Sequence, residues 1–563
     1  MTVLQYLSGS YDNRRGGFTL LLIKTLTIST FIFALLEIWR PLYFLTDDNL
    51  GGCFPLLTGI GQRIVDGKSP FIADYIFGGN YDLLSDCSLF CWHPIYLISS
   101  LLADTPARLL MVDVVAFFFL MVGAAGFVNL AYFLRQELSL KLSDGRLILY
   151  TLSFNYSMIV LTTGSSWVSF LGNHSALPWL ALGILQTSWR KGLTIVTLFS
   201  LHHILGGHIA ATISDSIFLS IFALGISIYR HSLLPLMSWF VGVTLAVGLL
   251  LPLLVPAWDG FFTSHRAAGL TPITMGKFAV PVLLFPFSFF FSTFSTLLPL
   301  HYRFGTTQIF YSSAFVSCAA AWAVLPAVIT RIKWRFLELL CLLLLALLAV
   351  MIVRPLWLSE IMLQLPLLKS MRWPFREILQ FQFFLHLFLV IRPQGGSLRL
   401  QRLLAFTGVF IFVFPLFFLE APSFQTMKLD RELLFSGGVD AYWKQVRPLL
   451  GPDDHIAVIA DTNMLERHPF DVPYTLLGAY NFPILIKVKS VTGYSVTTPY
   501  DHLYVKTIPA WNIGIFDTNQ RTSVMRERAN VRYITLESIK PLRITLSSRN
   551  GSVIDLTPYV PNK

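Results

Sequence analysis

The sequence is poor in charged residues and poor in cysteine. Charged residues make up 13% of the 563 residues, about half the share found in soluble globular proteins. Hydrophobic residues make up 54%, and apolar runs of about 20 residues, the length that crosses a lipid bilayer, recur along the chain. This composition excludes a soluble globular protein and predicts a polytopic α-helical membrane protein.

Motifs for several common chemistries are absent. The sequence has no phosphate-binding glycine loop, no nucleophile elbow and no His-Glu-x-x-His, which excludes ATP-driven and zinc-protease readings. The formal net charge is +11, but much of the Lys and Arg lies in short loops between apolar runs, where it sets membrane orientation. We therefore expect no nucleic-acid partner. No small-residue cleavage site follows the first apolar run, which predicts a retained helix.

The five cysteines are Cys53, Cys87, Cys91, Cys318 and Cys341. The last two lie within apolar runs and are expected to be packing residues. The first three share one loop with His93, which leaves open a disulfide in an oxidising compartment or a metal site. Such a metal site lacks a fourth ligand, so we expect no cofactor and keep a divalent metal as the alternative.

Basic clusters between the apolar runs predict the topology. With these clusters in the cytoplasm, crossings fall near 18–42, 107–134, 146–164, 174–189, 192–208, 212–229, 233–256, 311–329, 336–354, 377–392 and 402–420. These eleven crossings put the N-terminus in the cytoplasm and the C-terminus outside. The transmembrane domain is 1–420, with outward loops 43–106, 257–310 and 355–376. Two apolar stretches, 89–102 and 278–300, are expected to be re-entrant or interfacial.

Residues 421–563 contain no run that could cross a membrane. They contain alternating or β-branched stretches that begin at His455, Pro483 and Val531, with turn residues between them, and a short helix is expected within 430–450. This pattern predicts an extracytoplasmic mixed α/β domain. In the first outward loop, 43–106, the apolar residues of 54–65 share one helical face, which predicts a helix lying in the membrane interface.

Asp47 and Asp48 lie where the first apolar run leaves the bilayer. A carboxylate beside the membrane loses hydration, and its neighbour's charge acts in the same direction, so one of the pair becomes a better base near neutral pH. The alternative is a solvated exit in which the pair caps the helix that follows. Three further residues, Lys369, Arg372 and Arg376, either reach lipid headgroups or hold a phosphate. The histidines at 174, 202, 203 and 208 fall near membrane depth, where polar groups line cavities.

These motifs, taken in order, resemble the YfhO-like membrane proteins of the GT-C glycosyltransferase superfamily. They are Asp48 with Phe54-Pro55, Gly67-Lys-Ser-Pro-Phe-Ile-Ala-Asp-Tyr-Ile-Phe-Gly-Gly-Asn80, Trp92-His-Pro-Ile-Tyr96, Leu171-Gly-Asn-His-Ser-Ala-Leu-Pro-Trp179, Leu205-Gly-Gly-His208, Ser264-His-Arg-Ala-Ala-Gly269, Met371-Arg-Trp-Pro-Phe-Arg376 and Val491-Thr-Gly-Tyr-Ser-Val-Thr-Thr-Pro-Tyr500. One segment departs from the family, because Phe71-Ile-Ala-Asp-Tyr75 stands where a Leu-Trp-Asn-Pro-like sequence is expected.

The resemblance implies an inverting transfer of a sugar from a polyprenyl-phosphate donor to a glycan, lipid or protein acceptor, at the outer face of a bacterial inner membrane. Asp48, or Asp47 as second choice, would be the catalytic base. Arg372, Arg376, Lys369 and Arg266 would bind the donor phosphate. Trp92, His93, Tyr96, His174 and His208 would contact the sugar or the acceptor.

Two other classes of function stay open. A lipid-linked sugar transporter would use a similar basic cavity without a base, but the inverted repeats typical of transporters are not evident. A non-catalytic GT-C relative could serve as a subunit of a membrane complex. Only the Asp47–Asp48 pair separates that hypothesis from an enzyme.

Overall fold

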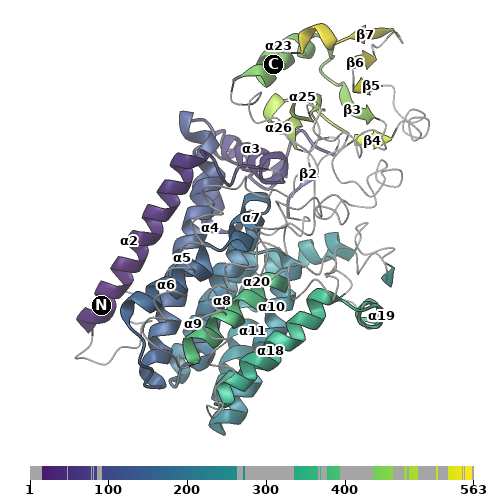
Figure 1. Ribbon diagram of the computed structural model, residues 1–563. Helices are drawn as coiled ribbons and strands as arrows, with labels where there is room; N and C mark the ends of the chain where they lie inside the picture. Colours follow the sequence, from purple (N-terminus) through teal and green to yellow (C-terminus); the bar gives the residue numbers. More distant parts are fainter. Residues whose placement is uncertain are drawn as a thin grey trace.

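The computed structural model describes residues 15–46, 48–77, 79, 81–84, 92–262, 271–272, 335–365, 368, 377–392, 434, 436–460, 474–478, 481–491, 515–517, 530–539, 541–547, 550 and 552–560. This part of the chain forms a bundle of long helices and a small sheet region near the C-terminus (Figure 1). The expected crossings at 311–329 and 402–420, and the apolar stretch 278–300, lie outside the described residues.

The bundle is built from long apolar helices. They are α2 (Arg15–Trp39), α5 (Met111–Glu137), α8 (Ser169–Leu185), α9 (Trp189–Gly206), α10 (Ile209–Arg230), α11 (Leu234–Phe262), α18 (Phe336–Val353) and α20 (Ile378–Ile391). Within the described residues, five segments are long and apolar enough to cross a membrane: Gly17–Trp39, Pro106–Glu137, Ile209–Arg230, Leu234–Gly260 and Phe336–Val353. The mostly helical fold with these apolar segments is that of a helical membrane protein, while the count of eleven crossings stays a prediction.

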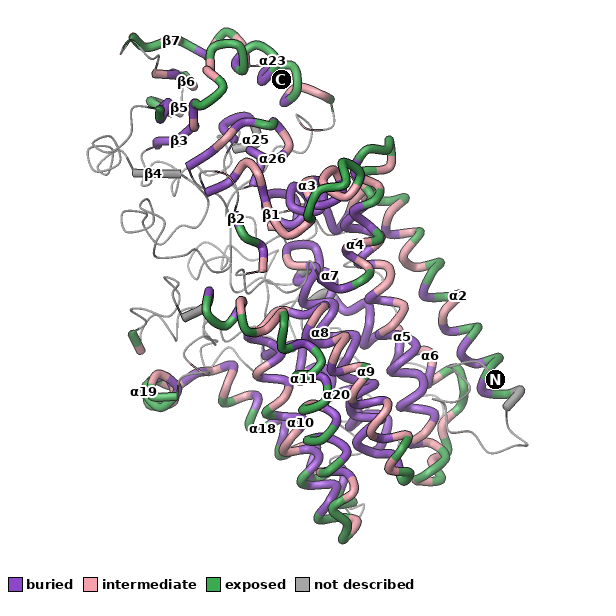
Figure 2. The backbone as a smooth tube through the Cα atoms, turned by 180° about the vertical axis from the view of Figure 1, so that it is seen from behind, coloured by how far each residue is buried: buried purple, intermediate pink, exposed green. Residues whose placement is uncertain are grey.

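Burial separates the inner helices of the bundle from the outer ones. Every residue of α8 is buried, and α8 packs against both α5 and α9. By contrast, α2 and α11 expose large apolar side chains such as Phe31 and Leu249 along their outer sides (Figure 2). A surface of this kind is stable against lipid tails, because the tails are as apolar as the side chains.

The crossing expected at 146–164 is broken into two helices, which corrects the sequence prediction. They are α6 (Asp144–Asn155) and α7 (Met158–Ser166), and the backbone leaves the helical conformation at Tyr156 and Ser157. A break inside a bundle releases backbone groups that need new partners. Gln382 of α20 supplies one of them, because its side-chain Nε2 donates a hydrogen bond to the carbonyl of Phe154 at 2.8 Å.

Two short helices of the first loop cover one end of the bundle. The helix predicted at Phe54–Val65 is present as α3, and α4 (Pro94–Ser100) falls within the apolar stretch 89–102. The apolar face of α3 is covered by protein rather than by lipid, which corrects the interfacial prediction. Gly61 of α3 permits this packing, since a Cβ atom there would lie 1.9 Å from the carbonyl oxygen of Ser100.

The described residues from 434 to 560 form what we call the C-terminal unit. Its five-stranded sheet has the order β4-β3-β5-β6-β7, in which β3 is parallel to β4 and β5, and β5, β6 and β7 are antiparallel. The strands are β3 (His455–Ala460), β4 (Ile515–Asp517), β5 (Val531–Ile539), β6 (Leu542–Ser547) and β7 (Val553–Asp555), with helices α23 (Gly438–Val446), α25 (Tyr474–Leu477) and α26 (Phe482–Ile486).

The structure confirms the strands expected to begin at His455 and Val531 and the helix expected within 430–450. The strand expected to begin at Pro483 is wrong, because that segment forms helix α26. A short apolar run does not by itself distinguish a buried strand from a buried helix.

The C-terminal unit packs on the first loop (Figure 1). The backbone N–H of Asn481 donates to the carbonyl of Gly51 at 3.0 Å, and the N–H of Ser490 donates to that of Tyr75 at 2.8 Å. A Cβ atom on Gly59 of α3 would lie 2.9 Å from a methyl group of Ile484 in α26. The first loop is thus sandwiched between the bundle and the C-terminal unit.

Candidate functional site

Asp48 lies in the turn between α2 and α3, directly before a five-residue π-helix, Asn49–Cys53. Single π-helical turns are rare and are frequent at functional sites. Asp48 is half-buried, and the indole Nε1 of Trp167 donates a hydrogen bond to its Oδ2 at 2.5 Å. Because Trp167 lies between α7 and α8, the bundle itself orients this carboxylate.

Asn49 ties the same turn to the bundle. Its side chain is buried, and its Nδ2 donates to the carbonyls of Phe44 and Gly164, each at 2.8 Å. Its Oδ1 accepts the backbone N–H of Val168 at 2.9 Å. The side-chain amide of Asn49 thus joins the segment after α2 to the α7–α8 connection, and these three hydrogen bonds hold the residue next to Asp48 in place.

The C-terminal unit holds the π-helix from the other side. The side-chain Nδ2 of Asn481 donates to the carbonyl of Gly52 at 3.3 Å, beside the backbone contact with Gly51. Glycines allow this close approach of another backbone. The turn that carries Asp48 therefore depends on contacts from two regions that are far apart in the sequence.

An aromatic row leads from Asp48 to His208. Trp167 contacts Phe170 with ring centroids 5.8 Å apart, and Phe170 stacks on His208 at 4.8 Å. His208 caps α10, because its Nδ1 accepts the N–H of Ala210 at 3.2 Å. Two of the residues selected from the sequence, Asp48 and His208, are thereby connected through one aromatic pair.

His93 joins the first loop to the bundle through a directed hydrogen-bond chain. Its Nδ1 accepts the N–H of Ile95 at 3.2 Å, so its proton lies on Nε2, which donates to Nδ1 of His202 at 3.0 Å. His202 in turn donates from Nε2 to Ser175 at 2.8 Å, and Ser175 donates to the carbonyl of Gly172 at 2.9 Å. Burial lowers the pKa of His93 to about 4, so the side chain is neutral at neutral pH.

The other three residues expected to contact a sugar are buried packing residues in this structure. Trp92 lies against Phe71 with centroids 4.1 Å apart, Tyr96 is fully buried, and His174 stacks on Phe154 at 4.0 Å. Their rings fill the core, so a sugar could not reach them in this conformation. Their burial is thus an observation of the structure, and their contact with a sugar stays a prediction.

Several expected site residues fall outside the described part of the chain: Asp47, Arg266, Lys369, Arg372 and Arg376. Sequence reasoning missed several buried cations among the described residues, and one of them is Arg354 at the end of α18. Its guanidinium interacts electrostatically with the carboxylate of Glu377. Glu377 accepts a hydrogen bond from Ser214 of α10, so Arg354 belongs to a polar cluster within the bundle.

Sequence reasoning also missed buried carboxylates, among them Asp113 and Asp215. Asp113 of α5 accepts the backbone N–H of Phe44 at 3.0 Å, and Asp215 of α10 lies 2.7 Å from Nε2 of His203. A single acidic residue within an apolar run was the available signal. Acidic residues at membrane depth are costly unless they have partners, so each predicts a polar partner on a neighbouring helix.

Cys53 is a buried free thiol, and burial raises its pKa to about 12. A disulfide through Cys53 is therefore wrong, while Cys87 and Cys91 lie outside the described residues. Where the chain is described, no three His, Cys, Asp or Glu side chains group closely enough to hold a metal ion.

Three comparisons with known proteins give no relative. No family model matches the sequence, and no curated protein and no solved structure matches the chain. The fold and site define a helical membrane protein that holds an oriented carboxylate at one end of its bundle, beneath a small α/β unit.

Proposed function

We propose that this protein is a membrane glycosyltransferase that moves a sugar from a polyprenyl-phosphate donor to an acceptor at the outer face of the membrane, with inversion. The observation that supports it most is the placement of Asp48. It is an acidic residue in the turn that follows α2, a helix with exposed large apolar side chains, and Trp167 donates a hydrogen bond to its carboxylate. An oriented carboxylate next to the bilayer is what general-base attack on a membrane-bound donor requires.

In this proposal Asp48 accepts the proton of the acceptor hydroxyl as that oxygen attacks the anomeric carbon. The bond from the anomeric carbon to the phosphate oxygen breaks, and polyprenyl phosphate leaves with the electron pair. Cations stabilise the charge that develops on the leaving phosphate. Arg372, Arg376, Lys369 and Arg266 are the proposed donor-phosphate ligands, with His208 at the far end of the aromatic row as an acceptor or sugar contact.

The proposal also fixes an orientation. The N-terminus is cytoplasmic, and the C-terminal unit and the first loop lie outside the cytoplasm of a bacterial inner membrane. Possible partners are a glycan, lipid or protein acceptor, membrane lipids and other subunits of a membrane complex. No cofactor enters the proposed chemistry.

The test compares Asp48→Asn with a matched control, Asp144→Asn. Asp144 is an exposed carboxylate at the start of α6 that pairs with Arg135, so the control makes the same chemical change at the opposite end of the bundle. The full chain in lipid nanodiscs is given a panel of radiolabelled polyprenyl-phosphate sugars and membrane extract as the source of acceptor. Transfer and donor binding are both measured.

We expect Asp48→Asn to bind the donor like the parent protein and to lose transfer by at least about 10²-fold, the low end for general-base catalysis. Asp47→Asn should be milder, and Asp144→Asn should transfer normally. Full transfer by Asp48→Asn, Asp47→Asn and the double variant would contradict the proposal, and the non-catalytic subunit would then explain the fold better.

A further inference from the structure

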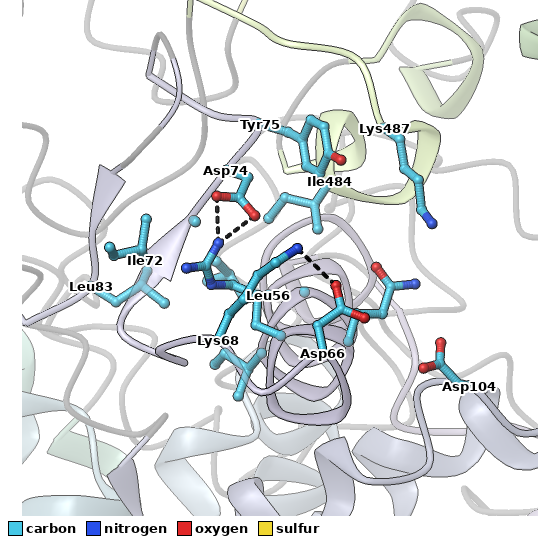
Figure 3. A pocket seen from close by; sticks show the side chains of 15 residues that line it. Leu56, Asp66, Lys68, Ile72, Asp74, Tyr75, Leu83, Asp104, Ile484 and Lys487 are labelled. Carbon is cyan, nitrogen blue, oxygen red and sulfur yellow. Dashed lines mark hydrogen bonds and ion pairs between the residues drawn. The ribbon is translucent and has the colours of Figure 1, made fainter.

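A cavity of about 150 Å³ lies between the first loop and the C-terminal unit (Figure 3). Side chains from α3, from the segment of β1 (Ile72–Ala73) that pairs with β2 (Tyr81–Asp82), and from α26 line it. Asp48, Trp92, His93, Tyr96, His174 and His208, the described residues that the sequence selected as a base or sugar contact, are not among the residues that line this cavity.

Arg63 is a fixed hydrogen-bond donor at the cavity. Its Nε donates to the carbonyl of Ser69 at 2.6 Å, and its Nη1 donates to the carboxylate of Asp74 at 2.5 Å. The side chain is only 13% exposed, so these two contacts hold the guanidinium in place. Its Nη2 makes no hydrogen bond with any described residue. Arginine fixed in this way loses little entropy when it binds a further acceptor.

The charges that line the cavity cancel. They are three cations, Arg63, Lys68 and Lys487, and three carboxylates, Asp66, Asp74 and Asp104. Lys68 also pairs directly with Asp66 at 3.0 Å. A free anion would meet as many carboxylates as cations, and so would a free cation. A neutral ligand with many hydrogen-bonding groups suits this lining best, because charged and amide groups can donate to it and accept from it.

The lining also has an apolar part. Leu56 and Ile60 of α3 and Ile484 of α26 are buried there, and the ring of Tyr75 lies beside them (Figure 3). The volume is about half the lower limit for a drug-sized ligand, roughly 300 Å³, so it fits one ring. A sugar residue combines one ring, no charge, several hydroxyls and apolar C–H faces.

We propose that this cavity binds one neutral sugar residue, which contacts both α3 and the C-terminal unit. Lys487 reaches it from the C-terminal unit, and Tyr75 carries the carbonyl that accepts the N–H of Ser490. The contacts that join the two parts thus form the edge of the cavity. The proposal concerns binding alone and does not rest on Asp48 acting as a base.

The test measures binding by saturation-transfer NMR on the full chain in lipid nanodiscs. The probes are glucose, galactose, mannose and N-acetylglucosamine, each as the free sugar and as a disaccharide, with inorganic phosphate as the anionic comparison. The variants are Gln62→Ala and Arg63→Lys, which remove donors from the lining. Gln136→Ala is the matched control, because this exposed glutamine lies at the end of α5 and outside the cavity.

We expect saturable binding of at least one sugar, weakened about tenfold or more by Arg63→Lys, because a contact from a charged donor is lost. Gln62→Ala should weaken it by a few fold, and Gln136→Ala should leave it unchanged. Thermal midpoints matching the parent's show that the variants are folded. Binding of a disaccharide identifies a residue within a glycan as the ligand, and binding of monosaccharides alone identifies a free sugar; either result supports the site.

Three results would overturn the proposal. The first is no saturable binding of any sugar up to its solubility limit. The second is phosphate binding that competes with the sugar, which would identify an anion site. The third is unchanged sugar affinity in both Gln62→Ala and Arg63→Lys with folded protein, which would place the sugar elsewhere.

Discussion

The contact between Asn481 and the π-helix predicts that the C-terminal unit controls how often the turn around Asp48 opens. Asn481 is completely buried, and its Nδ2 donates to the carbonyl of Gly52 at 3.3 Å. Asn481→Ala removes this donor and leaves the backbone contact to Gly51 in place. The change is therefore a small perturbation of one interface rather than a loss of the C-terminal unit.

The magnitude follows from the geometry. Removing one partner of a buried hydrogen bond costs about 1–3 kcal/mol. A distance of 3.3 Å is longer than the usual N–H···O range, about 2.7–3.2 Å, so we expect the low end, about 1–1.4 kcal/mol. Since about 1.4 kcal/mol corresponds to a factor of ten, the population of the open turn should rise about five- to tenfold.

Cys53 provides the assay, because it lies in the same π-helix. Its thiol is buried, and burial raises its pKa to about 12, so alkylation needs the turn to open and expose the sulfur. In a background where the other four cysteines are replaced by alanine, the rate at which a maleimide labels Cys53 reports the opening. Asn481→Ala should raise that rate about five- to tenfold, in proportion to the open population.

Asn129→Ala is the matched control. Asn129 is a buried asparagine of α5 whose Nδ2 donates to the carbonyl of Ala125 at 2.7 Å. The Asn129→Ala variant loses the same kind of hydrogen bond at a position that makes no contact with the π-helix, so the labelling rate of Cys53 should not change. Equal labelling rates in Asn481→Ala and the parent would refute the reasoning, as would an equal increase in Asn129→Ala, which would indicate global loosening.

Two further predictions concern the first loop. Gly61→Ala should lower the thermal midpoint, with a loss of about 1–3 kcal/mol from overpacking against α4, whereas Gly145→Ala, where an added Cβ meets nothing within 4 Å, should not; equal midpoints would contradict the close packing. Burial puts the pKa of folded His93 at about 4 against an ordinary 6.5. Between these values the unfolded state binds more protons, so the stability from neutral His93 is complete above pH 6.5 and is lost as the pH falls towards 4, by about 3 kcal/mol in all. His93→Asn, which keeps a capping side chain, should flatten the fall of the thermal midpoint with pH; an unchanged slope would show that another group causes it.

Much of the fold follows from local patterns in the sequence. The long apolar runs predict membrane helices, and the spacing of apolar residues in 54–65 predicts α3 at its observed bounds. What covers α3 does not follow from its own sequence. Its apolar face meets α26, more than 400 positions later in the chain, and only the tertiary structure shows whether lipid or protein is the partner.

Two of the wrong predictions, the unbroken crossing at 146–164 and the strand at Pro483, have different causes. The break between α6 and α7 has no glycine or proline at Tyr156 and Ser157, and a distant side chain, Gln382, satisfies the carbonyl that the break releases. No local signal marks such a position. The helix α26 did carry a local signal, since Pro483 falls in its first turn, where proline is favoured in helices. The alternation of apolar residues was given more weight than that proline.

The candidate site shows the same division between local and distant information. Asp48 was visible from its position at the end of an apolar run, but what orients it was not, because Trp167 and Asn481 come from other parts of the chain. Sequence also favoured buried aromatic and imidazole rings such as Tyr96 and His174 as ligand contacts. Residues that fill a core and residues that line a site are of the same types, and only their burial in the structure separates them.

The placement of these contacts has a consequence for how the protein can be divided. Asp48 is held by the bundle through Trp167 and Asn49, and the π-helix after it is held by Asn481 of the C-terminal unit. If the C-terminal unit were removed, the carbonyls of Gly51 and Gly52 would lose their donors and the apolar face of α3 would meet water. Losing a buried hydrogen-bond partner and exposing apolar surface both favour opening of the turn. The C-terminal unit is therefore part of the structure that positions the carboxylate, and a truncated bundle would not preserve the site.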